Sequence, residues 1–255
     1  MPEHFESSDP NTSSGVDREI NQKLLEIVRI ADSKDPSQAI DVIYAPPIMG
    51  ELPSPETSEL FSAANDNLYA VKINDQYTSP DIESYLQALI EELKTSIPDL
   101  DLGKLYLIGF SASCNMVAKT AQRMGLPKEQ VLLGAPIWSP KHFLRERIHG
   151  VLRSIRHRTS ISQAFGIDMD YGRRLSQLRR DRTSAKGYDI LRRFAFIPPD
   201  ELSSGTVFSG RRDAVSPRTH HTDIYLPDAG HQFSQFAQKI VEYIESRRNI
   251  SRINR

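Results

Sequence analysis

The sequence has little cysteine, no long apolar run and almost no net charge. Among its 255 residues only Cys114 carries a thiol, so no disulfide can form within the chain, which is typical of a reducing compartment. No apolar stretch approaches the ~18 residues of a membrane span. The first 15 residues, MPEHFESSDPNTSSG, contain neither the basic nor the apolar part of a secretory signal. We therefore expect a soluble cytoplasmic protein with a disordered leader over residues 1–15.

Charge is low overall but uneven along the chain. The formal net charge is −1, which gives no indication of nucleic-acid binding. Residues 141–193 nevertheless hold 14 Lys/Arg and 5 Asp/Glu, so a basic segment is attached to an acidic body. The histidines have no cysteine or carboxylate at metal-ligand spacing, and we expect neither a metal nor a cofactor.

Hydrophobic patterns predict alternating strands and helices. Strands are predicted at 39–44, 68–73, 104–108, 130–133, 205–209 and 223–226. Helices are predicted at 16–31, 80–97 and 112–124 and over the C-terminal segment that carries Phe233, Phe236 and Ile240. Residues 50–66 form a polar, proline-containing stretch without a predicted element. This alternation favours a parallel sheet flanked by helices, with right-handed crossovers.

Several local signals set the predicted helix ends. Ser79 is the expected N-cap of the second helix, with Pro80 at its first position and Asp81 near the positive end of its dipole. Gly125 is the expected left-handed residue after the third helix.

The basic segment interrupts the alternation and divides the chain. Residues 16–138 and 201–248 are predicted to form the α/β core, and residues 139–200 a basic helical insertion. Residues 249–255 are predicted to be a frayed tail.

A sharp turn follows the predicted strand at 104–108. Its sequence, Gly-Phe-Ser-Ala-Ser, centres on Ser111 and nearly matches the Gly-x-Ser-x-Gly turn that presents a nucleophilic serine. Ser113 replaces the second glycine. A serine hydroxyl becomes an effective nucleophile only when a base takes its proton and a third group orients that base.

Candidates for both partners occur downstream in the required order. Asp213 follows the fifth predicted strand and His231 follows the sixth, the chain order Ser, Asp, His of α/β-hydrolases. The carboxyl ends of parallel strands share one edge of the sheet, so we expect these three side chains to meet there.

Other interpretations stay open for each of these residues. Ser111 can be a helix cap, Asp213 a turn residue and His231 a surface histidine. Asp223 and Asp228 are alternative acids. His220 and His221 are expected to be solvated in a loop. Three further histidines are expected to adjust the charge of the basic segment: His142, His149 and His157.

Acyl transfer also needs backbone N–H groups to stabilise an oxyanion. One donor is expected to be Ala112, directly after the serine. The other is expected in the loop APPIMG after the first predicted strand. Its prolines lack N–H groups, which leaves Ile48, slightly favoured, or Met49.

Several of these motifs together resemble a known family. VIYAPPIMG, IESYLQALIEELK, LYLIGFSAS, GRRD and GHQF resemble the α/β-hydrolase thioesterases associated with polyketide and nonribosomal peptide synthesis, over about residues 39–135 and 205–245. The resemblance implies an α/β-hydrolase fold with a compact, mostly parallel sheet and a helical lid at 139–200. It also implies Ser111 as nucleophile, Asp213 as acid partner and His231 as base, acting on an acyl thioester.

The chain departs from that family at the turn, where Ser113 and Cys114 stand in place of two glycines. We expect Cys114 to be a packed small residue. The basic lid suits an acidic acyl or peptidyl carrier protein as a partner, besides a small-molecule acyl substrate. Two alternatives stay open: an acyltransferase or cyclase with the same three residues, and a non-catalytic binding protein with this fold.

Overall fold

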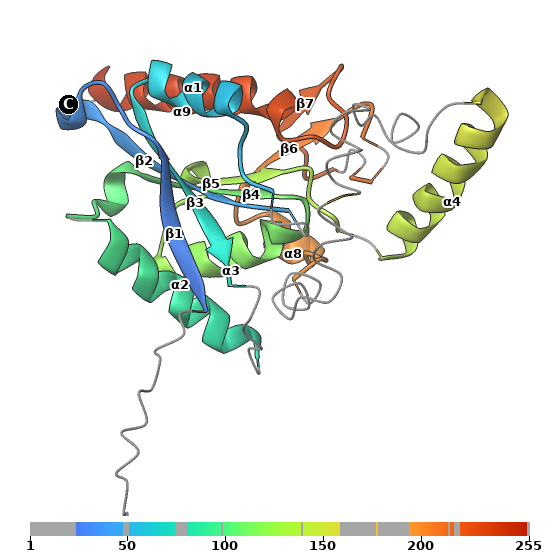
Figure 1. Ribbon diagram of the computed structural model, residues 1–255, viewed down its shortest axis with the longest axis horizontal. Helices are drawn as coiled ribbons and strands as arrows, with labels where there is room; N and C mark the ends of the chain where they lie inside the picture. Colours follow the sequence, from blue (N-terminus) through green and yellow to red (C-terminus); the bar gives the residue numbers. More distant parts are fainter. Residues whose placement is uncertain are drawn as a thin grey trace, which may run out of the picture.

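The centre of the protein is a seven-stranded sheet with the order β1-β3-β2-β4-β5-β6-β7 (Figure 1). The computed structural model describes residues 24–47, 51–74, 81–97, 99–138, 140–158, 177, 194–213, 215–216 and 220–253. The strands are β1 Leu25–Ala31, β2 Ile40–Ala45, β3 Asp66–Ile73, β4 Leu105–Phe110, β5 Val131–Gly134, β6 Thr206–Gly210 and β7 Ile224–Leu226. Strand β1 is antiparallel to β3, and all other neighbouring pairs are parallel.

Helices cover both faces of the sheet. They are α1 Pro55–Ala63, α2 Ile82–Ser96, α3 Cys114–Met124, α4 Pro140–His157, α8 Pro199–Leu202 and α9 Ser234–Ile253. Four short 3₁₀ turns accompany them: η1 Pro36–Gln38, η2 Leu102–Lys104, η3 Ser111–Ser113 and η4 Lys128–Gln130. Helices α1 and α9 lie on one face and α2 and α3 on the other, whereas α4 stands apart from the body (Figure 1).

Each face of the sheet packs its own hydrophobic core. Successive side chains of β2 alternate: Val42 and Tyr44 belong to the core under α1 and α9, and Ile43 to the core under α2 and α3. Strand β4 is buried along its whole length. Central strands covered on both faces carry continuous apolar runs, and this is why the sequence predicted β2 to β6 at nearly their observed positions.

The predicted helix at 16–31 is wrong where the structure describes it, because Leu25–Ala31 is a strand. Leu25 and Ile27 are buried while Glu26 is exposed between them, a period of two. Pairing of β1 with β3 satisfies the backbone at the sheet edge, and this tertiary contact outweighs the local helical spacing. Residues 16–23 and the predicted leader lie outside the described residues.

One helix was not predicted, and another begins at a different residue than predicted. The polar stretch at 50–66 contains α1, which Ser54 caps by accepting a hydrogen bond from the Thr57 N–H. Helix α2 begins at Ile82, and the N-cap is Asp81, whose carboxylate accepts the Ser84 N–H at 2.6 Å. The expected cap Ser79 and Pro80 lie outside the described residues.

Of the two predictions for C-terminal helix ends, one is confirmed and one is wrong in part. Gly125 has φ +68° after α3, as predicted for a left-handed C-cap. The predicted frayed tail is wrong over its first part, since α9 continues to Ile253.

The two ends of the insertion lie next to each other. The backbone N–H of Ile197, near the end of the insertion, donates to the carbonyl of Ile137, just before its start, at 2.9 Å. Most of the segment between, residues 159–176 and 178–193, lies outside the described residues. Within the described chain, no helix has the length and apolar character needed to cross a membrane.

Candidate active site

The nucleophile candidate sits on a strained turn at the end of β4. Ser111 has φ +58° and is nearly fully buried, a left-handed conformation that costs a non-glycine residue of order 1–3 kcal/mol. The chain passes through η3 directly into α3. A Cβ at Gly109 would lie 2.7 Å from the Cα of Cys114, so this tight strand-to-helix contact requires the first glycine of the motif.

Ser113 accounts for the missing second glycine. Its Oγ accepts the Phe110 N–H at 2.9 Å and donates to the Ala45 carbonyl at 2.7 Å. The hydroxyl therefore fastens the serine turn to the end of the neighbouring strand β2. Ser113 is fully buried, and its side chain fits without opening the turn.

Cys114 is a packed residue, as the sequence predicted. Its Sγ lies 3.3 Å from the Gly109 carbonyl and 3.4 Å from the Gly134 carbonyl. Burial raises the pKa of this thiol well above its usual value, so the reactive thiolate form is disfavoured.

Asp213 lies in the turn after β6, and its side chain is fully buried. Its Oδ1 accepts two backbone N–H groups, from Val215 at 2.9 Å and Ser216 at 2.8 Å. Ser216 in turn donates its hydroxyl to the Pro136 carbonyl at 2.5 Å. These bonds hold the acid turn against the chain that leaves β5, and they orient Oδ2 toward the histidine.

His231 lies between the acid and the serine. Its Nδ1 is 2.9 Å from Oδ2 of Asp213, and its Nε2 is 2.9 Å from Oγ of Ser111. Phe110 packs beside the imidazole, with ring centroids 5.4 Å apart. The structure thus brings together the three residues that the sequence placed after three different strands.

The alternative acids are used elsewhere. Asp223 accepts the Val207 N–H at 2.9 Å and pairs with Lys128 at 3.0 Å. Asp228 is exposed and pairs with Arg212 at 3.2 Å. Neither contacts His231 in the described contacts, so among the three candidates only Asp213 meets the histidine.

The other histidines lie away from this arrangement. The rings of His220 and His221 pack on each other in the loop before β7, with centroids 3.8 Å apart. His149 and His157 are exposed on α4. No group of three or more His, Cys, Asp or Glu residues suited to a metal ion occurs in the part of the chain that the structure describes.

One predicted oxyanion donor can be located. Ala112 is fully buried in η3, directly after Ser111, where the first N–H groups of a helical turn lack partners from that turn. Ile48 and Met49 lie outside the described residues. The chain up to Pro47 is described, and Ala45 at its base is the residue that Ser113 holds.

Sequence reasoning missed Gly210, at the end of β6. A Cβ there would lie 2.3 Å from the Ala229 carbonyl, and Arg212 donates its backbone N–H to that same carbonyl at 2.9 Å. The acid turn and the histidine loop thus pack backbone to backbone. The signal was present in the sequence as the glycine that begins GRRD.

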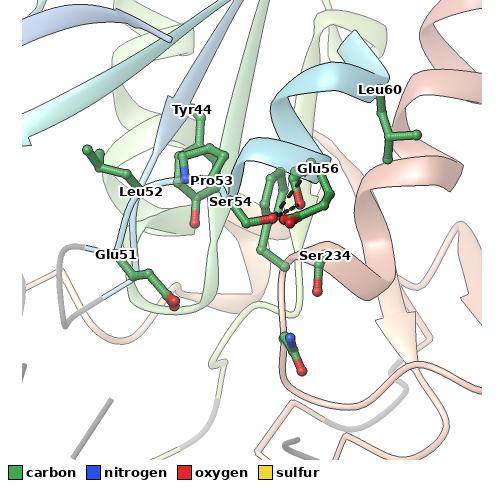
Figure 2. Close-up of a pocket in the computed structure, with 11 residues that line it drawn as sticks. Tyr44, Glu51, Leu52, Pro53, Ser54, Glu56, Leu60 and Ser234 are labelled. Atoms are coloured by element: carbon green, nitrogen blue, oxygen red, sulfur yellow. Dashed lines mark hydrogen bonds between the residues drawn. The ribbon is translucent and has the colours of Figure 1, made fainter. Parts of the chain in front are cut away.

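A pocket opens beside the histidine loop. It has a volume of about 380 Å³ and lies between the segment before α1 and the start of α9 (Figure 2). It is lined by Tyr44, Glu51, Leu52, Pro53, Ser54, Glu56, Thr57, Leu60, Gln232, Phe233 and Ser234. Phe233 packs on both Tyr44 and Phe110, so one pocket wall also supports the ring beside His231.

Comparisons of the fold with known structures give a consistent answer. An esterase from Exiguobacterium antarcticum matches with a TM-score of 0.55 and 14% identity, over 87% of this chain and 95% of that chain. The enol-lactonase from Burkholderia xenovorans matches with 0.54 and 14%, over 86% and 96%. A thermophilic esterase matches with 0.52 and 15%, over 89% and 97%.

Comparisons of the amino-acid sequence find no relative. No protein-family model matches the chain, and no curated protein matches it. The structural matches share too little sequence to transfer an activity, but TM-scores above 0.5 over most of both chains show that their fold is shared. The protein has the α/β-hydrolase fold.

Proposed function

We propose that this protein is a serine hydrolase that cleaves an acyl ester or acyl thioester through an acyl-serine intermediate. The observation that carries the proposal is His231, which lies 2.9 Å from both Ser111 and Asp213. Nucleophile, base and orienting acid within hydrogen-bond reach are the requirement for this chemistry. The esterases and lactonase with the same fold are consistent with it.

Acylation follows from the geometry. With Nδ1–H donating to Asp213, Nε2 of His231 is free to accept the Ser111 proton as Oγ attacks the substrate carbonyl. The carbonyl oxygen takes the electron pair and becomes an oxyanion, for which the Ala112 N–H is one proposed donor. Collapse of this intermediate breaks the bond to the leaving oxygen or sulfur, which receives the proton from His231.

Deacylation repeats these steps with water. His231 takes a proton from water, the resulting hydroxide equivalent attacks the acyl-serine carbonyl, and Ser111 Oγ leaves with the proton. The second oxyanion donor is proposed to be Ile48 or, less favoured, Met49, on the loop whose base is held by Ser113. The carboxylate of Asp213 orients the imidazole and stabilises the imidazolium that forms.

The decisive test is covalent labelling. A fluorophosphonate should label the wild-type protein on Ser111, and Ser111→Ala should remove the label while the protein keeps its thermal unfolding profile. A panel of p-nitrophenyl esters and acyl thioesters of varied chain length then compares ester with thioester cleavage. Folded wild-type protein that is neither labelled nor active on any substrate would instead support a non-catalytic binding protein.

Hydrolysis and acyl transfer are separated by their products. The same acyl-serine can react with an amine or hydroxyl in place of water, or cyclise. Product analysis with competing nucleophiles should give the free acid; an amide, a transferred ester or a lactone as the main product would contradict hydrolysis.

Four finer features belong to the proposal: a lid, a surface for a carrier protein, a small-molecule acyl substrate and a cytoplasmic location. Residues 139–200 are proposed to act as a lid over the acyl site, and an acidic carrier protein is one of the partners that their basic charge would suit. The pocket next to the histidine loop, which has both polar and apolar lining residues, supports a small-molecule acyl substrate. A cytoplasmic location rests on the single cysteine.

A further inference from the structure

Helix α4 carries an exposed apolar stripe. Leu144, Ile148, Val151, Leu152 and Ile155 are spaced as one face of a helix, and their exposure ranges from 42% at Val151 to 70% at Ile155. They are five of the ten exposed large apolar side chains among the described residues. The other five are dispersed over separate elements, so α4 is where exposed apolar side chains gather.

The same helix is strongly basic. Over residues 140–157 the sequence has five Lys/Arg and one Asp/Glu. Arg145 and Arg156 are exposed, and both lie next to the stripe: Arg145 borders a hollow of about 340 Å³ with Leu144 and Ile148, and Arg156 one of about 330 Å³ with Leu152. Apolar side chains are therefore paired with cations along the helix.

The helix is attached to the edge of the sheet that holds the candidate active site. It follows the chain from β5 through Pro136, whose carbonyl accepts the Ser216 hydroxyl of the acid turn. Trp138, which is partly buried, packs its ring against the core at this junction. Figure 1 shows α4 projecting from the body beyond this edge.

We propose that α4 is an interfacial helix that binds the surface of an anionic phospholipid membrane. A basic amphipathic helix lies in the plane of such a surface with its apolar face in the headgroup region and its cations at the lipid phosphates. Docking in this way brings the Ser111 edge of the sheet toward the lipid.

An anionic surface fits the charge distribution better than a neutral one. The basic segment, residues 141–193, carries an excess of nine positive charges, four of them in α4, and the remainder of the chain an excess of ten negative charges. An anionic surface therefore attracts the segment that contains α4 and repels the rest of the chain. An acidic protein would satisfy the arginines alone. A lipid surface accommodates both the cations and a single aliphatic stripe along 18 residues of helix, and for this reason we favour it.

The test is co-sedimentation of the full-length protein with vesicles. Vesicles of phosphatidylcholine containing phosphatidylserine should bind it, whereas pure phosphatidylcholine vesicles should bind it weakly. The double variant Ile148→Asp/Leu152→Asp should lose binding to the anionic vesicles by about a hundredfold, because two apolar anchors are removed. Arg145→Ala/Arg156→Ala should lose roughly twentyfold, since each cation near an anionic surface contributes about fivefold.

The matched control variants change exposed residues of the same kinds outside α4. Leu102→Asp places a charge on an exposed apolar residue away from α4, and Lys34→Ala/Lys72→Ala removes two exposed cations. Both should bind as the wild type does. Thermal unfolding checks that every variant is folded.

Three results would overturn the proposal. The first is no binding of wild-type protein to the anionic vesicles. The second is binding that survives Ile148→Asp/Leu152→Asp. The third is that the wild-type protein does not bind vesicles but instead binds an acidic acyl carrier protein saturably, or self-associates in light scattering, and that Ile148→Asp/Leu152→Asp abolishes this interaction. None of these depends on hydrolysis, so the outcome is separate from that of the proposed function.

Discussion

Two buried aspartates lie at opposite ends of the sheet and are held in different ways. Asp213 follows the end of β6, and Asp66 begins β3. Both side chains are fully buried. Asp213 faces a histidine and two backbone N–H groups, whereas Asp66 faces one arginine, Arg248 of α9.

The difference lies in how completely each carboxylate is satisfied. Both oxygens of Asp213 have a hydrogen-bond partner. Only one oxygen of Asp66 is bonded in the described contacts; Oδ2 is buried without a partner. Burial raises the pKa of Asp66 to about 7, although Arg248 opposes the shift.

This contrast separates a site arranged for chemistry from one that fastens an element. Backbone N–H groups fix the Asp213 carboxylate in direction, which a carboxylate that orients a histidine needs. Asp66 joins α9 to the start of β3, where Arg248 also donates to the Ala64 carbonyl at 2.8 Å. The same residue type therefore serves a proposed reaction at one edge and the attachment of a helix at the other.

The largest effect on activity is expected when each of the two aspartates is replaced by asparagine. Asp213→Asn should lower kcat/KM by about 10⁴, because the amide no longer holds the tautomer of His231 that accepts the serine proton. Asp66→Asn is the matched isosteric control and should leave kcat/KM unchanged. Steady-state kinetics on the best substrate of the ester panel decides this, and equal losses in the two variants would contradict the distinction.

A smaller loss is expected from Gly210→Ala. The added Cβ would lie 2.3 Å from the Ala229 carbonyl, which forces the acid turn and the His231 loop apart. A displacement of about 1 Å in such a site costs about a hundredfold in rate, and kcat/KM measures it. The control is Gly103→Ala, whose Cβ would meet only the side chain of Asp101; activity retained in Gly210→Ala would show that the two loops adjust independently.

The pH dependence of the free energy of unfolding tests how Asp66 is held. The pKa of Asp66 is about 7 in the folded protein against 3.8 as its ordinary value, so the folded chain binds this proton more tightly. The contribution to stability is therefore present below about pH 4 and is lost as the pH rises to about 7, by up to about 4 kcal/mol.

Urea unfolding across this range checks the sign. The wild-type free energy of unfolding, relative to that of Asp66→Asn, should fall as the pH rises. A relative stability that increases with pH would mean that Arg248 outweighs burial and that Asp66 is an ordinary ion pair.

The smallest effect concerns Ser113. Ser113→Ala leaves the Phe110 N–H and the Ala45 carbonyl buried without this partner, which should lower the free energy of unfolding by about 1–3 kcal/mol. We also expect a lower kcat with fluorophosphonate labelling retained, because the loop after β2 loses its link to the turn. Thr120→Val, in the following helix α3 with a side-chain bond only to Met116, is the control, and an equal effect there would remove the special role of Ser113.

Sequence patterns predicted the central strands well because those strands are buried on both faces. Their apolar runs and the Ser, Asp and His after three of them were readable without any contact information. The edge strand β1 was taken for a helix, since its residues satisfy both spacings and only pairing with β3 decides between them. The capped start of α1 at Ser54 was passed over inside a polar stretch.

The sequence by itself determined the α/β alternation and the chain order of Ser111, Asp213 and His231, because hydrophobic periodicity and strand-end turns are local properties. It left three acids open, and it presented Ser113 as a departure from the motif. Only the tertiary structure decided these points. It buries Asp213 against the histidine, directs Asp223 and Asp228 to lysine and arginine partners, and gives Ser113 a carbonyl on the neighbouring strand. Each of these contacts joins residues far apart in the chain, and no local pattern encodes which of them will form.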